Sequence, residues 1–193
     1  MTDDAGPVGE PTARLERGGW TLSEDTTETL FSLPTARVEG RTRLYEDPKL
    51  REIIHAAGGP DHVWRFFFAT NVEFEPPLAP GVGPMIQPSV VSEAKRRFAD
   101  DLRDRGFESV RQGSTQSYRV DGGRARLTPF GASYPMEGRD IDIRGYLAVW
   151  RDGGFRIAGG AYPDAGLKGL LKEVPVDAEA YREELLSLLR SVG

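Results

Sequence analysis

The fold is decided by residues 62–75, which read HVWRFFFATNVEFE. Aromatic and β-branched side chains dominate this run, as is typical of strands. Successive side chains of a strand point to opposite faces. The following residues share one face: Trp64, Phe66, Phe68, Val72 and Phe74. The sequence therefore predicts a central strand that lays this face against a hydrophobic core.

Two Asp-Gly-Gly turns, at residues 121–123 and 152–154, indicate how the later strands connect. Each separates two strand-like runs, and Asp-Gly and Gly-Gly pairs are strong hairpin signals. Residues 20–22, 29–33 and 37–45 read as further strands nearer the N-terminus. Because hairpins join antiparallel strands, we expect a largely antiparallel sheet.

Three segments have the apolar spacing of amphipathic helices. The first begins at Asp47, a good capping residue, and ends near residue 57 before two glycines. The second is predicted over residues 89–105. The third begins at Asp177 and carries an apolar stripe: Tyr181, Leu185, Leu188, Leu189 and Val192. The predicted fold class is therefore α+β, a largely antiparallel twisted sheet flanked by about three helices.

The chain has 193 residues, the length of one domain. Residues 1–18 are polar and rich in Gly and Pro, so we expect a disordered tail followed by one domain over residues 19–193. Residues 76–88 are predicted to be a long loop with apolar side chains. The absence of Cys excludes disulfides, thiolate metal ligands and cysteine nucleophiles.

The formal net charge of −5 argues against general nucleic-acid binding, which needs an excess of clustered cations. No apolar run is long enough to span a membrane, and no signal peptide is visible, so we expect a cytoplasmic protein. Lys occurs only at positions 49, 95, 168 and 172, and Arg supplies the other basic residues. An acidic, Arg-rich composition is found in proteins from GC-rich genomes, including those of halophiles.

Motifs for chemistry are weak in this sequence. The glycines of residues 81–86 sit between a strand and a helix, but Pro84 and Ile86 break the dinucleotide-binding pattern, which favours a packed loop. His55 and His62 are weak metal candidates, since nothing specifies a third ligand. We assign no catalytic residue and no cofactor.

The second face of the predicted sheet interleaves arginines with aromatic side chains. The candidate ligand-binding residues there are Arg41, Arg43, Arg65, Phe67, Arg144, Tyr146, Trp150 and Arg156. Arginine forks carboxylates and phosphates and stacks on aromatic rings, so this face suits a small anionic ligand or a protein partner. The alternative is an ordinary solvated face of an antiparallel sheet.

Four segments carry a resemblance: residues 74–77 (FEPP), 99–107 (ADDLRDRGF), 146–150 (YLAVW) and 159–163 (GGAYP). They resemble a family of uncharacterised proteins from halophilic archaea. The similarity covers most of residues 20–192 and implies no activity. The order of elements is more loosely similar to PsbP-like domains, which implies a non-catalytic accessory role.

These observations lead to one preferred function and two alternatives. The preferred hypothesis is a non-catalytic binding or accessory domain that uses the Arg/aromatic face. The first alternative is a small hydrolase-like or acid–base enzyme, with carboxylates or His55 and His62 in a cleft. The second is a single-stranded nucleic-acid binder that stacks bases on the aromatic side chains.

Overall fold

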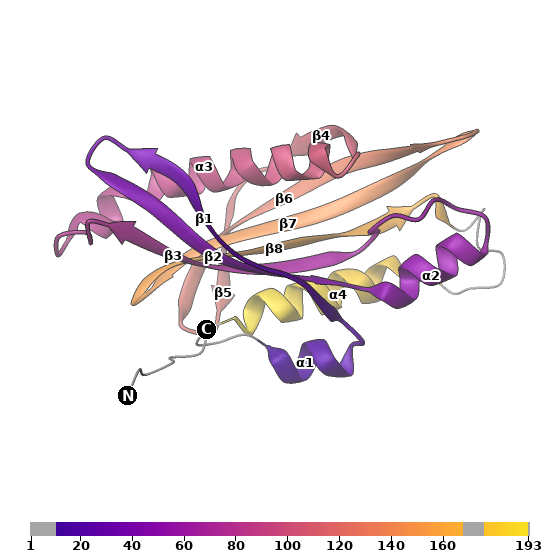
Figure 1. Cartoon of the computed structure of the whole chain (residues 1–193), viewed down its shortest axis with the longest axis horizontal. Coiled ribbons are helices and arrows are strands. Elements are labelled where there is room, and N and C mark those ends of the chain that lie inside the picture. Colours follow the sequence, from indigo (N-terminus) through magenta and orange to yellow (C-terminus); the bar gives the residue numbers. More distant parts are fainter. Residues whose placement is uncertain (1–10, 168–175, 193) are drawn as a thin grey trace.

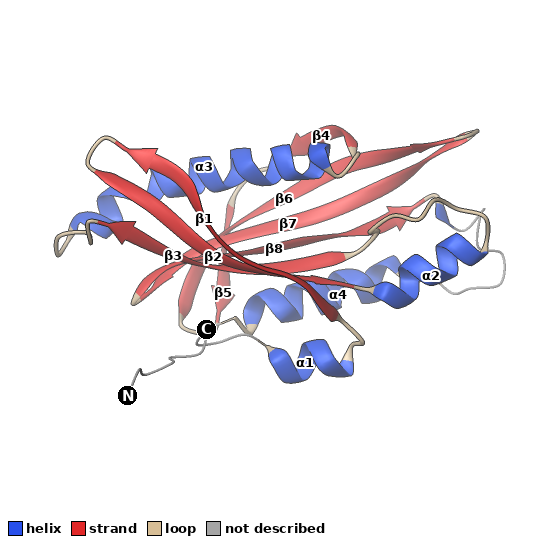
Figure 2. Ribbon diagram, in the orientation of Figure 1, coloured by secondary structure: helices blue, strands red, loops and turns tan. Residues whose placement is uncertain are grey.

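The sheet is the centre of the architecture, with helices on both of its faces (Figures 1 and 2). The computed structural model describes residues 11–167 and 176–192. Over these residues the strands are β1 (Thr21–Leu33), β2 (Ala36–Glu46), β3 (Phe66–Glu75), β4 (Glu108–Gln112), β5 (Gln116–Val120), β6 (Gly123–Met136), β7 (Arg139–Asp152) and β8 (Gly154–Ala165). The helices are α1 (Thr12–Arg17), α2 (Pro48–Ala56), α3 (Val82–Asp104) and α4 (Ala178–Arg190).

The eight strands form one sheet in the order β1-β2-β3-β8-β7-β6-β4, and β5 pairs with the start of β6. Each of these strand pairs among the described residues is antiparallel. The predicted central strand, β3, lies between β2 and β8, with Phe68 opposite Leu44 on one side and Gly159 on the other. The predicted α+β class is confirmed.

Alternation along the strands sends side chains into two separate cores. In β3, Phe66 and Val72 belong to the core under α3, whereas Phe67 and Ala69 belong to the core under α1 and α4. Figure 1 shows α3 on one side of the sheet and α1 and α4 on the other. Both faces of the central strands are therefore covered.

The predicted caps explain where two helices begin. Asp47 accepts a hydrogen bond from the backbone N–H of Leu50 at 3.1 Å, with Pro48 in the first turn. Asp177 accepts from the N–H groups of Glu179 and Ala180, both at 3.1 Å. These bonds satisfy N–H groups that have no partner inside the helix.

The structure corrects the prediction of a disordered tail where that tail is described. Residues 12–17 form α1, and Leu15 is buried in the α4-side core. The prediction failed because a helix this short is stabilised by the surface it covers rather than by its own sequence. Residues 1–10 lie outside the described residues.

Other boundaries also differ from the predictions. The segments predicted at 20–22 and 29–33 merge into one long strand, β1, which begins at Thr21, while residues 62–65 precede β3. The predicted loop at 76–88 is shorter, since α3 begins at Val82. Pro84 is tolerated there because the first turn of a helix has N–H groups without helical partners, and Pro88 lies on the exposed side.

Candidate ligand-binding cleft

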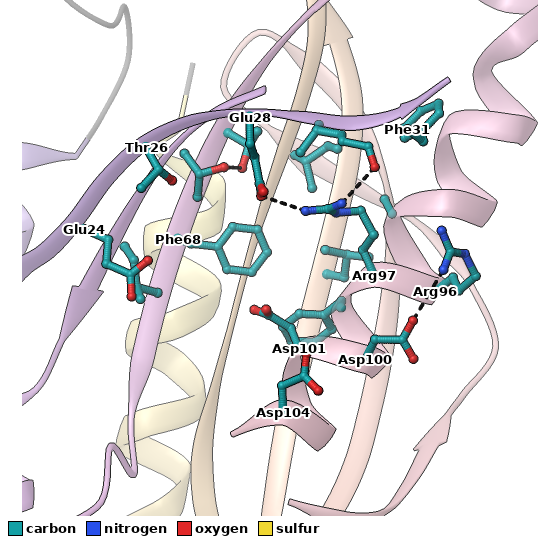
Figure 3. Close-up of a pocket in the computed structure, with 18 of the residues that line it drawn as sticks. Glu24, Thr26, Glu28, Phe31, Phe68, Arg96, Arg97, Asp100, Asp101 and Asp104 are labelled. Carbon is teal, nitrogen blue, oxygen red and sulfur yellow. Dashed lines mark hydrogen bonds and ion pairs between the residues drawn. The ribbon is translucent and has the colours of Figure 1, made fainter. Parts of the chain in front are cut away.

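A cleft of about 330 Å³ lies between the C-terminal half of α3 and the β1–β2 edge of the sheet (Figure 3). Its walls are β1 on one side and α3 on the other, over a floor from β2, β3, β7 and β8. The helix packs against β4, β6 and β7, which lie toward the opposite edge of the sheet from β1. We call this cavity the cleft.

The floor of the cleft is apolar. Its apolar side chains are Leu44, Phe68, Leu147 and Ile157, and Leu30 of β1 and Phe98 of α3 extend this apolar surface onto the walls. Figure 3 shows the ring of Phe68 in the middle of the cleft, and this ring lies 5.8 Å from that of Phe98. The hydroxyls of Thr42 and Thr70 are hydrogen-bonded to each other at 2.8 Å. Because these hydroxyls bond to each other, a ligand in the lower cleft needs no polar group to satisfy them.

Arg97 lies at one end of the cleft, where it connects the α3 wall to the β1 wall. The guanidinium donates to the backbone carbonyl of Leu30 at 2.8 Å and to Glu28 at 2.7 Å (Figure 3). Leu30 packs over Gly40, where a Cβ would lie only 2.6 Å from its side chain. Thus Gly40 and Arg97 together fix the position of β1 over the cleft.

The mouth of the cleft carries more carboxylates than cations. The carboxylates are Glu24, Glu28, Asp100, Asp101 and Asp104, and the cations are Arg96, Arg97 and Arg105. In the described parts of the chain, neither Glu24 nor Asp104 has an ion-pair partner. The mouth therefore has negative charge that the protein itself does not neutralise.

Asp101 faces this uncompensated charge. Its side chain keeps 55% of its surface exposed, and its carboxylate is 3.7 Å from Arg105. Desolvation by the cleft walls raises the pKa of Asp101 above its ordinary value. Arg105 and Arg97 oppose this shift, whereas Asp104 and Glu24 add to it. A cation bound beside Asp101 would favour its ionised form.

The predicted Arg/aromatic face lies on the side of the sheet that α4 covers. Phe67 and Trp150 are fully buried there, as are Tyr45 and Tyr162. A ligand cannot reach these rings unless α4 moves. The surface for base stacking that a single-strand nucleic-acid binder requires is covered in the same way.

Arg65, from the same predicted set, is part of the protein interior. It forms ion pairs with Asp47 at 3.0 Å and with Glu184 at 2.6 Å. The rings of Trp20 and Tyr181 lie against its guanidinium, at 4.6 and 4.3 Å from their centroids. The charge of Arg65 is therefore used to join α2, α4 and the start of β1.

The remaining members of the set do not converge. Arg41 and Arg43 bind Asp25 at the β1–β2 edge. Arg144 binds Asp164 at 3.0 Å, and Tyr146 accepts a bond from Arg182. Arg156 donates to Asn71 at 2.9 Å. The role of these residues in ligand binding stays a prediction. Among the candidates that follow β3 in the chain, Arg144 is the most exposed.

The two histidines lie in different environments. His55 is exposed on α2, whereas the His62 ring packs against Trp64, Phe107 and Tyr134. Burial lowers the pKa of His62 to about 4, and Arg105 contributes to the shift. Across the part of the chain that the structure describes, no three imidazole or carboxylate groups converge as metal ligands would.

The cleft carboxylates escaped the sequence analysis because β1 and α3 are far apart in the chain. A partial signal existed in residues 24–28, where the alternate positions of one strand face are Glu24, Thr26 and Glu28. That alternation fits a strand with one charged face, but it does not identify the helix opposite.

Within residues 11–167 and 176–192, no helix is both long and apolar enough to cross a lipid bilayer.

Comparison with known proteins identifies a family. The model of the family described as Domain of unknown function (DUF6517) matches residues 7–193. This match spans nearly the whole chain, so the chain belongs to that family. No curated protein and no solved structure is significantly similar to it.

Proposed function

We propose that this member of the DUF6517 family is a non-catalytic binding domain whose cleft holds a ligand with an apolar body and a cationic group. One observation carries the proposal: an apolar floor around Phe68 lies beneath Glu24 and Asp104, two carboxylates that form no ion pair with any residue that the structure describes. The volume of the cleft, about 330 Å³, is in the range of small-molecule sites.

The two parts of the cleft support different parts of the ligand. Contact with Phe68 and Leu44 would remove apolar ligand surface from water, which stabilises binding by about 25 cal/mol per Å². Glu24 and Asp104 would then receive an ammonium or guanidinium group at the mouth. Aromatic amines combine these two features in one small molecule.

Isothermal titration with tryptamine tests this proposal. Tryptamine carries an aromatic ring and an ammonium group, and indole-3-propionate presents the same ring with a carboxylate. We expect tryptamine to bind and indole-3-propionate to fail. Phe68→Ala and the double variant Glu24→Gln/Asp104→Asn should each weaken tryptamine binding about tenfold. The corresponding loss of binding free energy is close to that of one charged hydrogen bond.

Asp25→Asn is the matched control for the carboxylate variants. Asp25 adjoins Glu24 in β1, but its side chain points to the other face, where it binds Arg41 and Arg43. Removing its charge should leave tryptamine affinity unchanged. Equal weakening by Asp25→Asn and by the cleft variants would mean that net charge, rather than the cleft, attracts the amine.

A second candidate function is acid–base catalysis in the same cleft, and the raised pKa of Asp101 favours it. A carboxyl that is more readily protonated than usual, close to Glu24 and Asp104, resembles the pairs that share catalytic roles. Asp101→Asn separates the two functions. In a binding domain it should change affinity only modestly, whereas in an enzyme it should abolish turnover of a bound ester or amide probe.

The exposed arginines of the predicted face remain part of the proposal as contacts for an anionic ligand or a protein partner. Arg144, whose side chain is 57% exposed, is the best placed of them. If a partner is recovered with the wild-type chain, Arg144→Glu should weaken its capture, and retention of full capture would remove this face from the proposal.

A halophilic origin, a PsbP-like accessory role and a cytoplasmic location are also proposals. The acidic balance and the preference for Arg over Lys support the first of them. Unfolding in 0.1 M and 2 M KCl provides the test. A halophilic protein should gain stability in the higher salt, because salt screens the repulsion among its carboxylates.

A further inference from the structure

Four arginines lie together at the end of α3 opposite to the cleft. Arg119 of β5 stands directly opposite Arg124 of β6. The register of β6 with β7 pairs Arg126 with Val149, and its continuation by two residues places Arg124 beside Arg151. We call Arg119, Arg124, Arg126 and Arg151 the arginine row.

The spacing of the turns supports this continuation of the register. A Cβ on Gly122 would lie 2.6 Å from the carboxylate of Asp152, and one on Gly123 would lie 3.9 Å from the backbone carbonyl of Arg151. The two Asp-Gly-Gly turns therefore meet at this corner of the sheet. Strands are about 5 Å apart, so three strands place their arginines within about 10 Å.

All four side chains point to the α3 side of the sheet. Ala125 and Leu127 are buried in the α4-side core. Arg124 and Arg126 alternate with them along β6, so these two arginines point to the α3 side. Trp150 belongs to the same α4-side core, which places its neighbour Arg151 on the α3 side. The four guanidiniums therefore share one exposed surface.

Arg151 is held in place by packing rather than by a counter-ion. A Cβ on Gly83, in the first turn of α3, would lie 2.6 Å from a guanidinium nitrogen of Arg151. The guanidinium also lies 5.6 Å from the centroid of the Phe155 ring. Glycine within a helix lowers stability by about 1 kcal/mol relative to alanine. The small residue at position 83 leaves the space that Arg151 fills.

The arginine row has no counter-charge in the described chain. None of its members forms an ion pair there, although Asp121 and Asp152 lie in the adjoining turns. Like charges directly opposite each other destabilise a sheet. Arg151 also adjoins a helix N-terminus, which repels cations. Both unfavourable effects would disappear if an anion bound between the arginines.

We propose that the arginine row binds an oligophosphate group, such as the triphosphate of a small molecule. Guanidinium groups bind phosphate oxygens in pairs, and four arginines whose strand positions lie within about 10 Å match a short anion of high charge density. A shallow hollow adjoins the row, lined by Arg119, Arg124 and the residues between them, which are Val120, Asp121, Gly122 and Gly123. The net charge of −5 makes this local excess of cations stand out from the rest of the chain.

Isothermal titration with inorganic tripolyphosphate in 50 mM salt tests the proposal. We expect binding to the wild-type chain, and an affinity at least about tenfold lower for Arg124→Gln/Arg151→Gln. The matched control is Arg111→Gln/Arg139→Gln, which removes two exposed arginines that also lack ion pairs among the described residues. The control should bind as the wild type does.

Thermal unfolding without ligand gives a second readout. Arg124→Gln alone should unfold at a higher temperature than the wild type, because it relieves the repulsion between Arg119 and Arg124, which stand directly opposite each other. Equal tripolyphosphate binding by the row variant and the wild type would overturn the proposal. So would binding only to vesicles with 30% phosphatidylglycerol or to a single-stranded RNA, and so would binding to none of these probes.

Discussion

The two faces of the sheet have the same alternation of apolar side chains, but the helices cover them differently. On one face, α4 and α1 bury Phe67, Trp150 and Tyr162 together with the charge of Arg65. On the other, α3 covers β6 and β7 and leaves a cleft beside β1. The face whose arginines and aromatic rings predicted ligand binding is therefore interior, whereas the face of Phe66 and Phe68, predicted to pack on the core, holds the cavity.

The contrast predicts the largest effect at Trp150. Trp150→Ala removes a side chain with no exposed surface from the α4-side core, so it should destabilise the protein by about 3–5 kcal/mol in urea unfolding. A ligand-contacting Trp150 would instead tolerate truncation with little loss of stability. The counterpart is Phe68→Ala in the cleft, which should lower stability by only about 1–2 kcal/mol because this ring is already partly hydrated.

Arg65→Met tests whether the buried charge of Arg65 stabilises the packing on the α4 side of the sheet. The variant keeps an apolar stem but leaves Asp47 and Glu184 without their cation, and Arg65 is only 5% exposed. We expect a loss of about 3 kcal/mol in urea unfolding, near the lower limit for broken buried pairs because Glu184 retains contact with water. Arg41→Met, which breaks a surface pair with Asp25, should lower stability by less than about 1 kcal/mol. Similar losses for both variants would contradict the comparison.

His62, on the α3 side, makes the stability of the protein depend on pH. Its pKa is lowered to about 4, so between pH 6.5 and 4 the unfolded chain binds a proton that the folded chain does not. Stability is therefore present above pH 6.5 and is lost as the pH falls through this window. Between pH 7 and pH 5 we expect a loss of about 2 kcal/mol that His62→Phe abolishes. Equal pH dependence of both proteins in urea unfolding would show that His62 is not responsible.

Asp101→Asn should have the smallest effect. The raised pKa means that the folded state disfavours the ionised carboxyl, so the destabilisation is present above the folded pKa and disappears below the unfolded value of 3.8. The variant should be more stable than the wild type at pH 7 by less than about 0.5 kcal/mol, since the side chain is largely exposed. The gain should vanish at pH 3 in thermal unfolding, and a gain that persists there would have another cause.

Much of the fold could be predicted because its signals are local. The Asp-Gly-Gly turns at 121–123 and 152–154 specify hairpins through their own backbone preferences, and Asp47 and Asp177 begin helices through their own side chains. The alternation in β3 likewise sorts Phe66 and Phe67 onto opposite faces. These features need no knowledge of distant residues.

The cleft could not be predicted because it depends on distant parts of the chain. Glu24 and Asp104 approach each other only when β1 and α3 are placed on the same side of the sheet. Conversely, Arg65 has the sequence character of a surface cation, and only the positions of Asp47 and Glu184 make it an interior one. A residue type alone does not report whether a charge faces water, a ligand or a counter-ion.

β1 is the outermost strand of the sheet, and residues 21–29 are exposed along its length. An outer strand presents unpaired backbone groups that another chain can use to extend the sheet, and charged side chains discourage such pairing. Glu24, Asp25 and Glu28 supply negative charge at that edge. The carboxylates that give the cleft its mouth therefore also oppose aggregation, so its ligand chemistry and the solubility of the chain depend on the same residues.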